Sequence, residues 1–364
     1  ADCAAKGIKV VANAGGVNVP GCITALENLC EEQGLDLKIG GVYGDNLLGR
    51  EDLPVESMNE FQTGAALPSK TDSMNAYLGA RPIADALAAG ADVVVTGRVV
   101  DSAVMLGPLM HEFGWAETDY EQLAQGSLCG HVIECGAQCT GGNYTDWHTV
   151  PDFSDISYPI AEVSADGSFT IGIPEGSGGL ATVGSVGEQV LYEIGDPANY
   201  LLPDVACDFS NVVLEQLGEN LVGVSGARGR APGNRYKVCA TWRDGFQIKS
   251  CIMIGGPRAR EKAETALEAW IKRCRDHFAA NGIADFREVD LEYLGAEHTY
   301  GPHATDAARN TREVVGKFGL HHDDPNALQF AANEMVYLGT SGVPGFYGLG
   351  GGRVRPGGLT RVHS

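Results

Sequence analysis

The stretch that decides the fold runs from Tyr77 to Gly142 and reads YLGARPIADALAAGADVVVTGRVVDSAVMLGPLMHEFGWAETDYEQLAQGSLCGHVIECGAQCTGG. Pro82 and Gly90 bracket a short helix, because Pro is favoured in the first helical turn and Gly after the last one. The β-branched run Asp92–Thr96 (DVVVT) then has the composition of a parallel strand buried on both faces. Open α/β sheets bind ligands beyond the carboxyl ends of their strands. We therefore expect a site at the polar residues that follow this strand, namely Thr96, Gly97, Arg98, Asp101 and Ser102.

The segments ahead of this stretch predict a parallel sheet. Ile8–Ala12 and Leu37–Tyr43 are strand-like, and the segment Ile23–Gln33 between them has a helical pattern that Gly34 ends. Strands that alternate with helices favour βαβ units. We predict an α/β first domain over residues 1–155, with site loops at the ends of its strands.

The pattern changes beyond residue 155. Ile160–Val163 and Phe169–Ile173 flank SADGS, which indicates a hairpin because Asp-Gly readily adopts positive φ. Arg243-Asp244-Gly245 holds the same position between Tyr236–Trp242 and Phe246–Ile254 and predicts a second hairpin.

A helix and a strand follow these hairpins. Residues from about Ala259 to Phe278 place apolar side chains on one helical stripe, and Phe286–Leu294 is strand-like. We predict an α+β second domain over residues 156–364, with the boundary near Pro151–Tyr158. The Gly- and Pro-rich run Gly339–Val362 predicts a flexible tail, with a loop that closes over a site as the alternative.

Charge restricts the partners of this chain. The formal net charge is −21, and no Lys or Arg occurs from Val99 through Ala227. Nucleic acids and anionic membranes both require clustered cations, so we exclude them as partners. No apolar run is long enough to span a bilayer. We expect a small anionic substrate, met by Arg98 and by the cations that return at Arg228, Arg230, Arg235 and Lys237.

The ten cysteines do not form a disulfide scaffold. Cys129, Cys135 and Cys139 have a C-x5-C-x3-C spacing that fits neither zinc nor iron–sulfur patterns, so we expect buried thiols in the cytoplasm or an organelle matrix. Adjacent side chains in His321-His322-Asp323-Asp324 diverge on an extended chain, and we predict no metal site there.

Two short segments carry the candidate catalytic residues. In GRVVDSA, Arg98 would fix a substrate carboxylate and Asp101 would act as base, unless the two form only a structural ion pair. In GHVIECG, His131 and Cys135 are neighbours on either a strand or a helix, beside Glu134. This permits acid/base or Cys–His chemistry, with a structural histidine beside a buried thiol as the alternative.

Three Gly-rich turns are candidates for anion binding. One of them, Ser177–Gln189, leads into a helix-like segment and would bind an anion or only form a tight turn. NAGGVN, with Asn13, Gly15, Gly16 and Asn18, follows a strand and precedes a helix, so its backbone N–H groups would hold an anion or only form a tight turn. GARGRAPG would hold phosphate or carboxylate with its two arginines, or it is a solvated basic loop.

Six blocks of the chain resemble the acyclic terpene utilisation (AtuA) family. They are NAGGVNVPGC, the Tyr77–Trp115 segment, GHVIECGAQCTGG, YPIAEVSADGSF, EQVLYEIGDPANYLLPDV and PGFYGLGGGR, in family order across nearly the whole chain. Family members carry about a hundred residues ahead of the NAGG turn, and some end in a small ferredoxin-like domain. Neither segment is evident in this sequence, so we expect a missing N-terminal part and a ferredoxin-like partner domain.

The resemblance implies a step in acyl-CoA catabolism. We expect a homo-oligomeric lyase or hydro-lyase that acts on a branched, carboxylated acyl-CoA, with the CoA thioester as substrate and no separate cofactor. The alternatives are a non-catalytic scaffold subunit of a degradative or carboxylase complex, and a carbohydrate or nucleotide enzyme on the same frame. The mechanism requires residues 98–102 and residues 131–135 to meet in one cleft.

Overall fold

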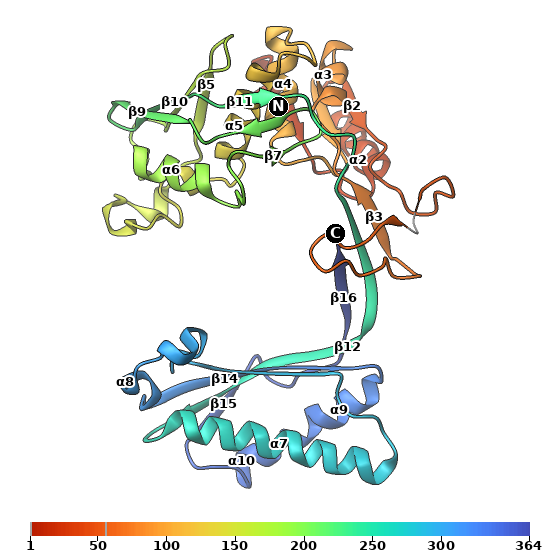
Figure 1. Ribbon diagram of the computed structural model, residues 1–364, viewed down its shortest axis with the longest axis vertical. Helices are drawn as coiled ribbons and strands as arrows, with labels where there is room; N and C mark the ends of the chain where they lie inside the picture. The colour runs from red at the N-terminus through yellow and green to blue at the C-terminus, as the bar shows by residue number, and fades with distance from the viewer. Residues whose placement is uncertain (1, 55–56) are drawn as a thin grey trace. The chain divides into compact units, whose positions relative to one another are not determined.

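The computed structural model describes residues 2–54 and 57–364, which form two compact units (Figure 1). Unit 1 comprises Ala1–Leu67, Ser73–Ala240 and Ser364, and unit 2 comprises Pro68–Asp72 and Thr241–His363. The expected boundary near residues 151–158 does not coincide with this division. Residues on the two sides of the expected boundary pack together, because Ile171 and Val222 share one hydrophobic core with Leu128.

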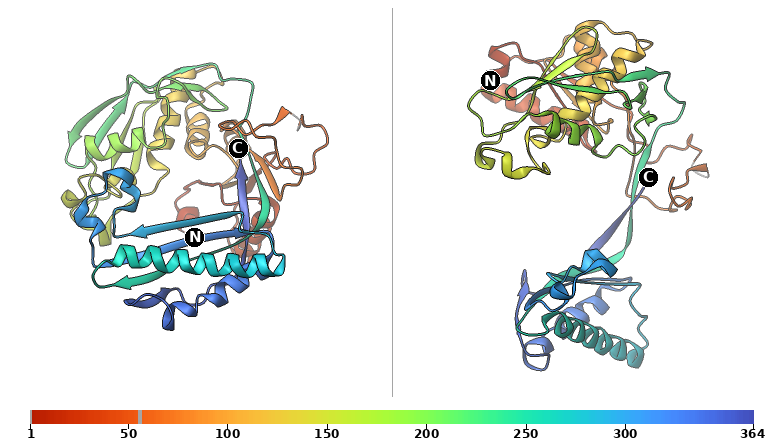
Figure 2. Two further views of the ribbon diagram at one scale, coloured as in Figure 1. Left: turned by 60° about the horizontal axis from the view of Figure 1, so that its bottom comes forward. Right: turned by 60° about the vertical axis from the view of Figure 1, so that its left-hand side comes forward.

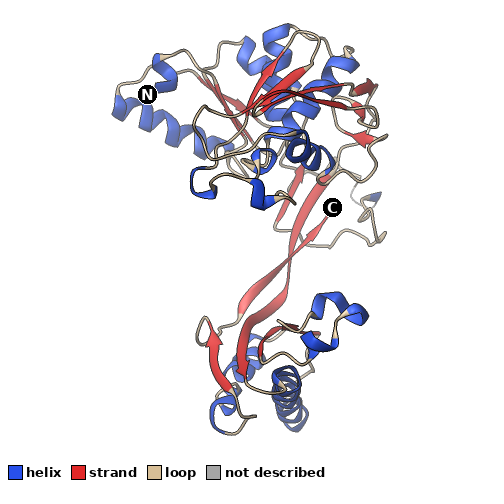
Figure 3. Cartoon of the chain, turned by 90° about the vertical axis from the view of Figure 1, so that its left-hand side faces the viewer, coloured by secondary structure: helices blue, strands red, loops and turns tan. Residues whose placement is uncertain are grey.

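A parallel sheet lies at the centre of unit 1. Its strands are β1 (Val10–Ala12), β4 (Val93–Thr96) and β2 (Ile39–Val42), in the order β1-β4-β2, and both pairs are parallel. Helices α2 (Val19–Gln33) and α3 (Arg81–Ala88) pack against these strands, and Figure 3 shows helices around the strands of unit 1. The predicted α/β class is confirmed, with the β-branched strand β4 in the middle of the sheet.

Two further helices extend the core beside this sheet. Helix α4 (Ala103–Phe113) packs on α3, and α5 (Tyr120–Ile133) packs on α4. Gly130 of α5 lies so close to α4 that a Cβ there would be 2.6 Å from the carbonyl oxygen of Ser102. This close approach brings the loop after β4 next to the end of α5.

An antiparallel sheet completes unit 1. Its order is β5 (Ile160–Val163), β6 (Phe169–Gly172), β10 (Leu221–Ser225) and β9 (Val213–Gly218), and the predicted hairpin at SADGS is the β5–β6 pair. The remaining elements of unit 1 are α1 (Asp2–Ala5), β3 (Ser73–Ala76), η2 (Gln138–Thr140), η3 (Trp147–Thr149), η4 (Phe153–Asp155), α6 (Val183–Leu191), and the small sheet β11 (Arg228–Arg230), β8 (Ala206–Asp208), β7 (Tyr200–Leu201).

Unit 2 is built on an antiparallel sheet with two helices. The strand order is β13 (Glu288–Leu294), β14 (Glu313–His322), β12 (Val238–Gly255) and β15 (Phe346–Gly350), with β12 belonging to unit 2 from Thr241 onward. Helix α7 (Ala259–Asn281) runs along this sheet (Figure 2), and the predicted apolar stripe of α7 is buried against it. The other elements are η5 (His298–His303), α8 (Asp306–Arg309), α9 (Pro325–Glu334), α10 (Tyr337–Thr340) and β16 (Gly357–His363).

The connectivity of unit 2 corrects one expectation from the sequence. Its main elements follow as β12-α7-β13-β14-α9-β15, and the strand order is β13-β14-β12-β15. This β-α-β-β-α-β arrangement is the ferredoxin-like, split βαβ motif. The ferredoxin-like domain is therefore part of this chain, although no local sequence signal revealed it.

Two local predictions in unit 2 were wrong. The hairpin expected at Arg243-Asp244-Gly245 does not form, because β12 continues through Gly245 with φ of 71° and pairs with β14 from Phe246 onward. The flexible tail expected over residues 339–362 instead contains β15 and β16, which both pair with β12. Among the described residues, no helix is both long and apolar enough to cross a membrane.

Candidate functional site

Three strands of unit 1 end at the same edge of the parallel sheet. Asn13 follows β1, Asp45 lies beyond the end of β2, and Gly97 and Arg98 follow β4. Asn13, Gly16, Gly97, Arg98 and Tyr77 line a cavity of about 280 Å³ at this edge. The structure thus brings together the NAGG turn and the start of GRVVDSA.

A buried carboxylate supports this edge. Asp45 is 4% exposed, and its side chain accepts hydrogen bonds from Asn75 Nδ2 at 2.8 Å and from the backbone N–H of Arg98 at 2.9 Å. Gly97 is required beside it, since a Cβ there would lie 2.5 Å from the carboxyl carbon. Asp45 therefore holds the loop that carries Arg98. Our sequence interpretation missed this role, although a polar residue just after the second strand was the available signal.

A larger cavity of about 530 Å³ shares Tyr77 and Arg98 with the first. Arg98 Cζ lies 4.1 Å and Lys237 Nζ lies 5.3 Å from the centroid of the Tyr77 ring, so two cations contact one aromatic side chain. Arg235 also lines this cavity. The same cavity is lined by the acids Asp101 and Glu193, the phenol of Tyr200, and the apolar residues Val100, Leu201, Leu202 and Pro203.

Arg98 and Asp101 form the ion pair that was the structural alternative. Arg98 Nη2 lies 3.6 Å from Asp101 Oδ1, and the two side chains are 37% and 49% exposed. A solvent-exposed pair of this kind contributes at most about 1 kcal/mol to stability. Both side chains still face the larger cavity, so the pair is open to a competing anion.

His131 lies at the end of α5 in a buried polar environment. It is 2% exposed, and its Nδ1 lies 3.3 Å from Glu134 Oε1. The side chain of Gln189 donates to the His131 carbonyl at 3.1 Å. His131 Nε2 has no hydrogen-bond partner among the described residues, which is uncommon for a buried ring nitrogen. On helix α5 His131 therefore pairs with Glu134, and its second ring nitrogen has no partner among the described residues.

Tyr200 connects this histidine to the cavity. Its ring centroid is 6.2 Å from that of His131, and it lines the larger cavity, whereas His131 does not. Burial, followed by the charges of Glu134 and Asp101, raises the pKa of Tyr200 to about 12. Asp101 lines this cavity with Tyr200, and His131 lies behind the Tyr200 ring, so Tyr200 lies between the two candidate segments. None of residues 131–135 lines the cavity, so it is not the single cleft that the expected mechanism requires. The sequence analysis did not identify Tyr200.

The environment of three cysteines near the candidate segments favours the thiol form. Burial raises the pKa of both Cys129 and Cys139 to about 12, and both are free. Burial and the neighbouring Glu134 charge also raise the pKa of Cys135. A raised pKa disfavours the thiolate, which is the nucleophilic form, so Cys135 is a poor nucleophile here.

The NAGG turn does not offer the amides that the sequence suggested. The N–H of Gly15 donates to the Thr96 carbonyl at 3.1 Å, and those of Gly16 and Asn18 donate to carbonyls within the turn. The Asn18 side chain caps α2 by accepting from the Gly21 N–H at 3.1 Å. These three N–H groups are therefore engaged, and the turn contributes the cavity wall instead.

Only some of the remaining substrate-binding candidates line a cavity at this site. Arg228 and Arg230 lie on strand β11 instead of a loop, and neither lines either cavity. Ser102 is buried at the start of α4 and also lies outside both cavities. Of the predicted cation cluster, only Arg235 and Lys237 reach the site.

The His321-His322 segment has a structural role within unit 2. Nε2 of His321 lies 2.5 Å from the carbonyl oxygen of Asp244, and Nε2 of His322 lies 3.0 Å from that of Ala284. Both side chains are buried at the end of β14. These contacts fix the end of β14, and each of the two rings contacts a different backbone carbonyl.

Comparison with known proteins identifies a matching family. The family model described as acyclic terpene utilisation family protein AtuA matches residues 1–361. No curated protein and no solved structure matches the chain.

Proposed function

Because the chain belongs to the acyclic terpene utilisation (AtuA) family, we propose that it is an enzyme of acyl-CoA catabolism whose substrate binds at Arg98 in unit 1. The substrate we propose is a branched, carboxylated acyl-CoA, and the reaction is that of a lyase or hydro-lyase. Membership of the family fits a role in the breakdown of terpenes through acyl-CoA intermediates.

The distribution of cations carries this proposal. Unit 1 holds ten of the 26 Lys and Arg residues and 31 of the 47 Asp and Glu residues, so the whole formal net charge of −21 belongs to it. Three of those ten cations, Arg98, Arg235 and Lys237, nevertheless line one cavity. Asp101 and Glu193 also line this cavity, so its three cations exceed its acids by one, and a net positive lining in so acidic a unit favours an anionic ligand.

The cavity suits an amphipathic anion. Its volume of about 530 Å³ lies in the range of small-molecule sites, roughly 300–1,000 Å³. Arg98 would hold the substrate carboxylate, because its guanidinium can form two parallel hydrogen bonds to it. Arg235 and Lys237 would hold the CoA phosphates, and the apolar residues Val100 and Leu201–Pro203 would contact the acyl chain.

Proton transfer beside the thioester requires a base and an acid. Asp101 faces the cavity and would accept the proton from the carbon next to the thioester. Tyr200 stays a neutral phenol at working pH and would donate to the departing group, with the His131–Glu134 pair behind it to return the proton. Glu134 is the second candidate base, although it does not line the cavity.

Binding is tested by thermal unfolding with a panel of CoA thioesters, free acids and nucleotides. A ligand present at 100 times its Kd stabilises the folded state by about 2.7 kcal/mol. We expect CoA thioesters to stabilise the wild-type protein and to lose this effect in R235A/K237A. The matched control is R228A/R230A, which removes the same charge from unit 1 outside the cavities. Equal losses in both variants, or stabilisation by nucleotides or free sugars alone, would contradict the proposal.

Chemistry is tested separately from binding. We expect the wild-type protein to exchange the hydrogen next to the thioester of a bound substrate for deuterium, as followed by mass spectrometry. D101N should slow this exchange by about 100-fold or more, because general-base catalysis supplies roughly 10²–10⁴-fold. Wild-type exchange in D101N and slow exchange in E134Q would transfer the role to Glu134. A protein that binds but never exchanges would support the scaffold alternative.

A further inference from the structure

The four-stranded antiparallel sheet of unit 1 has one face in the core and one face that no described element of unit 1 covers. Phe169, Ile171, Val222 and Val224 point into the core and are at most 3% exposed. The alternate residues of the same strands point outward, because successive side chains of a strand lie on opposite faces. Ile160 on β5 is 50% exposed and Leu217 on β9 is 50% exposed.

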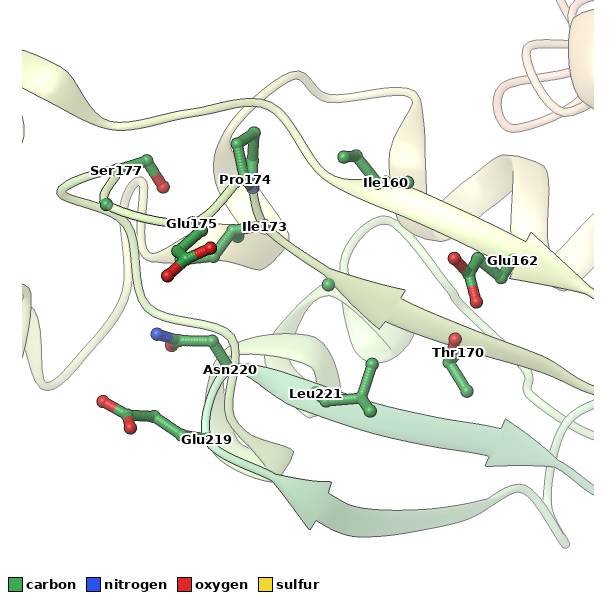
Figure 4. Close-up of a pocket in the computed structure, with 12 residues that line it drawn as sticks. Ile160, Glu162, Thr170, Ile173, Pro174, Glu175, Ser177, Glu219, Asn220 and Leu221 are labelled. Atoms are coloured by element: carbon green, nitrogen blue, oxygen red, sulfur yellow. The ribbon is translucent and has the colours of Figure 1, made fainter.

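The uncovered face is hollowed along its middle. The central strands β6 and β10 place Thr170, Gly172 and Gly223 on this face, and β5 and β9 flank them. Two hollows of about 600 and 230 Å³ lie here and share Glu162 and Thr170. Figure 4 shows Glu162 and Thr170 along the strands of the larger hollow. We call the two hollows together the sheet groove.

Four carboxylates line the sheet groove without compensation. Glu162 and Glu215 lie on the strands, and Glu175 and Glu219 lie on the loops at one end. Figure 4 shows Glu162, Glu175 and Glu219. No Lys or Arg lines either hollow, and none of the four glutamates forms an ion pair within residues 2–54 and 57–364. The groove therefore presents negative charge beside exposed apolar side chains.

The dimensions of the groove match a helix. Strands lie about 4.8 Å apart, so β5 and β9 are roughly 14 Å apart, whereas an α-helix with side chains is about 10–12 Å wide. Strands of four to six residues are about 13–20 Å long, which is the length of a helix of roughly 9–13 residues.

We propose that the sheet groove binds a basic amphipathic helix of a partner protein. The apolar face of the helix would pack on Ile160 and Leu217, over the floor formed by Gly172 and Gly223. Its Lys or Arg residues would reach the four glutamates, as in other recognition of amphipathic helices by grooves. This inference does not depend on the proposed catalytic function, because the groove shares no lining residue with the anion cavities.

The test uses the full chain and a fluorescent 14-residue helical peptide with Leu on one face and Lys on its flanks. Fluorescence anisotropy should show binding that weakens with salt, and a peptide with Glu in place of Lys should not bind. E162Q/E215Q/E219Q should weaken binding by about fivefold or more, since each exposed pair contributes a few tenths of a kcal/mol. I160S/L217S should also weaken it, with an unchanged slope against salt.

The matched control is E27Q/E31Q/E32Q, which removes three exposed charges from helix α2 of the same unit. It should change affinity less than twofold. Equal losses in the two charge variants would show general attraction to an acidic unit and would overturn the proposal. Displacement of the peptide by micromolar spermidine, with I160S/L217S behaving as wild type, would overturn it as well and indicate a small-cation site.

Discussion

Replacing Gly97 with Ala is expected to damage both the stability of unit 1 and ligand binding. A Cβ at this position would lie 2.5 Å from the carboxyl carbon of Asp45, which is only 4% exposed. The carboxylate must then move away from Asn75 and from the backbone N–H of Arg98, which it now contacts at 2.8 and 2.9 Å.

The magnitude follows from these two hydrogen bonds. Hydrogen bonds to a charged group contribute about 1.5–3 kcal/mol each, so losing both at the lower value costs about 3 kcal/mol. For a domain of 150–250 residues this corresponds to a decrease in Tm of roughly 6–12 °C. The loop that carries Arg98 loses its support, so affinity for the anionic ligand should decrease as well.

Differential scanning calorimetry with a double-mutant cycle tests the reasoning. G195A is the matched control, since a Cβ at Gly195 meets no atom within 4 Å. The stability of the G195A protein should therefore differ little from that of the wild type. D45A removes the side-chain atoms that cause the clash, so G97A/D45A should be hardly less stable than D45A alone. Additive losses, or a G97A protein with wild-type Tm, would refute the explanation.

Two further predictions concern other sites. In unit 2, burial alone would raise the pKa of Asp244, but the hydrogen bonds from Arg361 and Arg287 lower it below its ordinary value. The stability that this carboxylate contributes is therefore present above the ordinary aspartate pKa and is lost as pH falls through the lowered one. Urea unfolding should show that D244N is destabilising at pH 7 and much less so near pH 2; a loss independent of pH would contradict this. Replacing Tyr200 with Ala should expose His131 to diethylpyrocarbonate, whereas Tyr200→Phe should leave it protected; equal rates in both variants would show that Tyr200 is not the barrier.

The sequence predicted the elements whose signals are local. Strand β4 was recognisable from a β-branched run, and α7 from an apolar stripe that the structure buries completely. The strand-end location of Arg98 followed from the general behaviour of parallel sheets. These features depend on residues close together in the chain, so periodicity and composition were sufficient.

The features that the sequence missed depend on distant pairing. Strand β12 continues past Gly245 because β14, some seventy residues away, pairs with it, and the Gly-rich C-terminal run forms strands for the same reason. Tyr200 reaches the site from the short strand β7, which has no strong pattern of its own. The sequence around Arg228, Arg230, Arg235 and Lys237 did not indicate which of these cations would line the cavity.

The most direct measurement is a crystal structure of the protein with a bound carboxylated acyl-CoA. We expect the acyl carboxylate on Arg98, the phosphates against Arg235 and Lys237, and the carbon next to the thioester beside Asp101. Electron density for the ligand elsewhere in the molecule, with the Arg98–Asp101 pair undisturbed, would contradict the proposal that the substrate binds at Arg98.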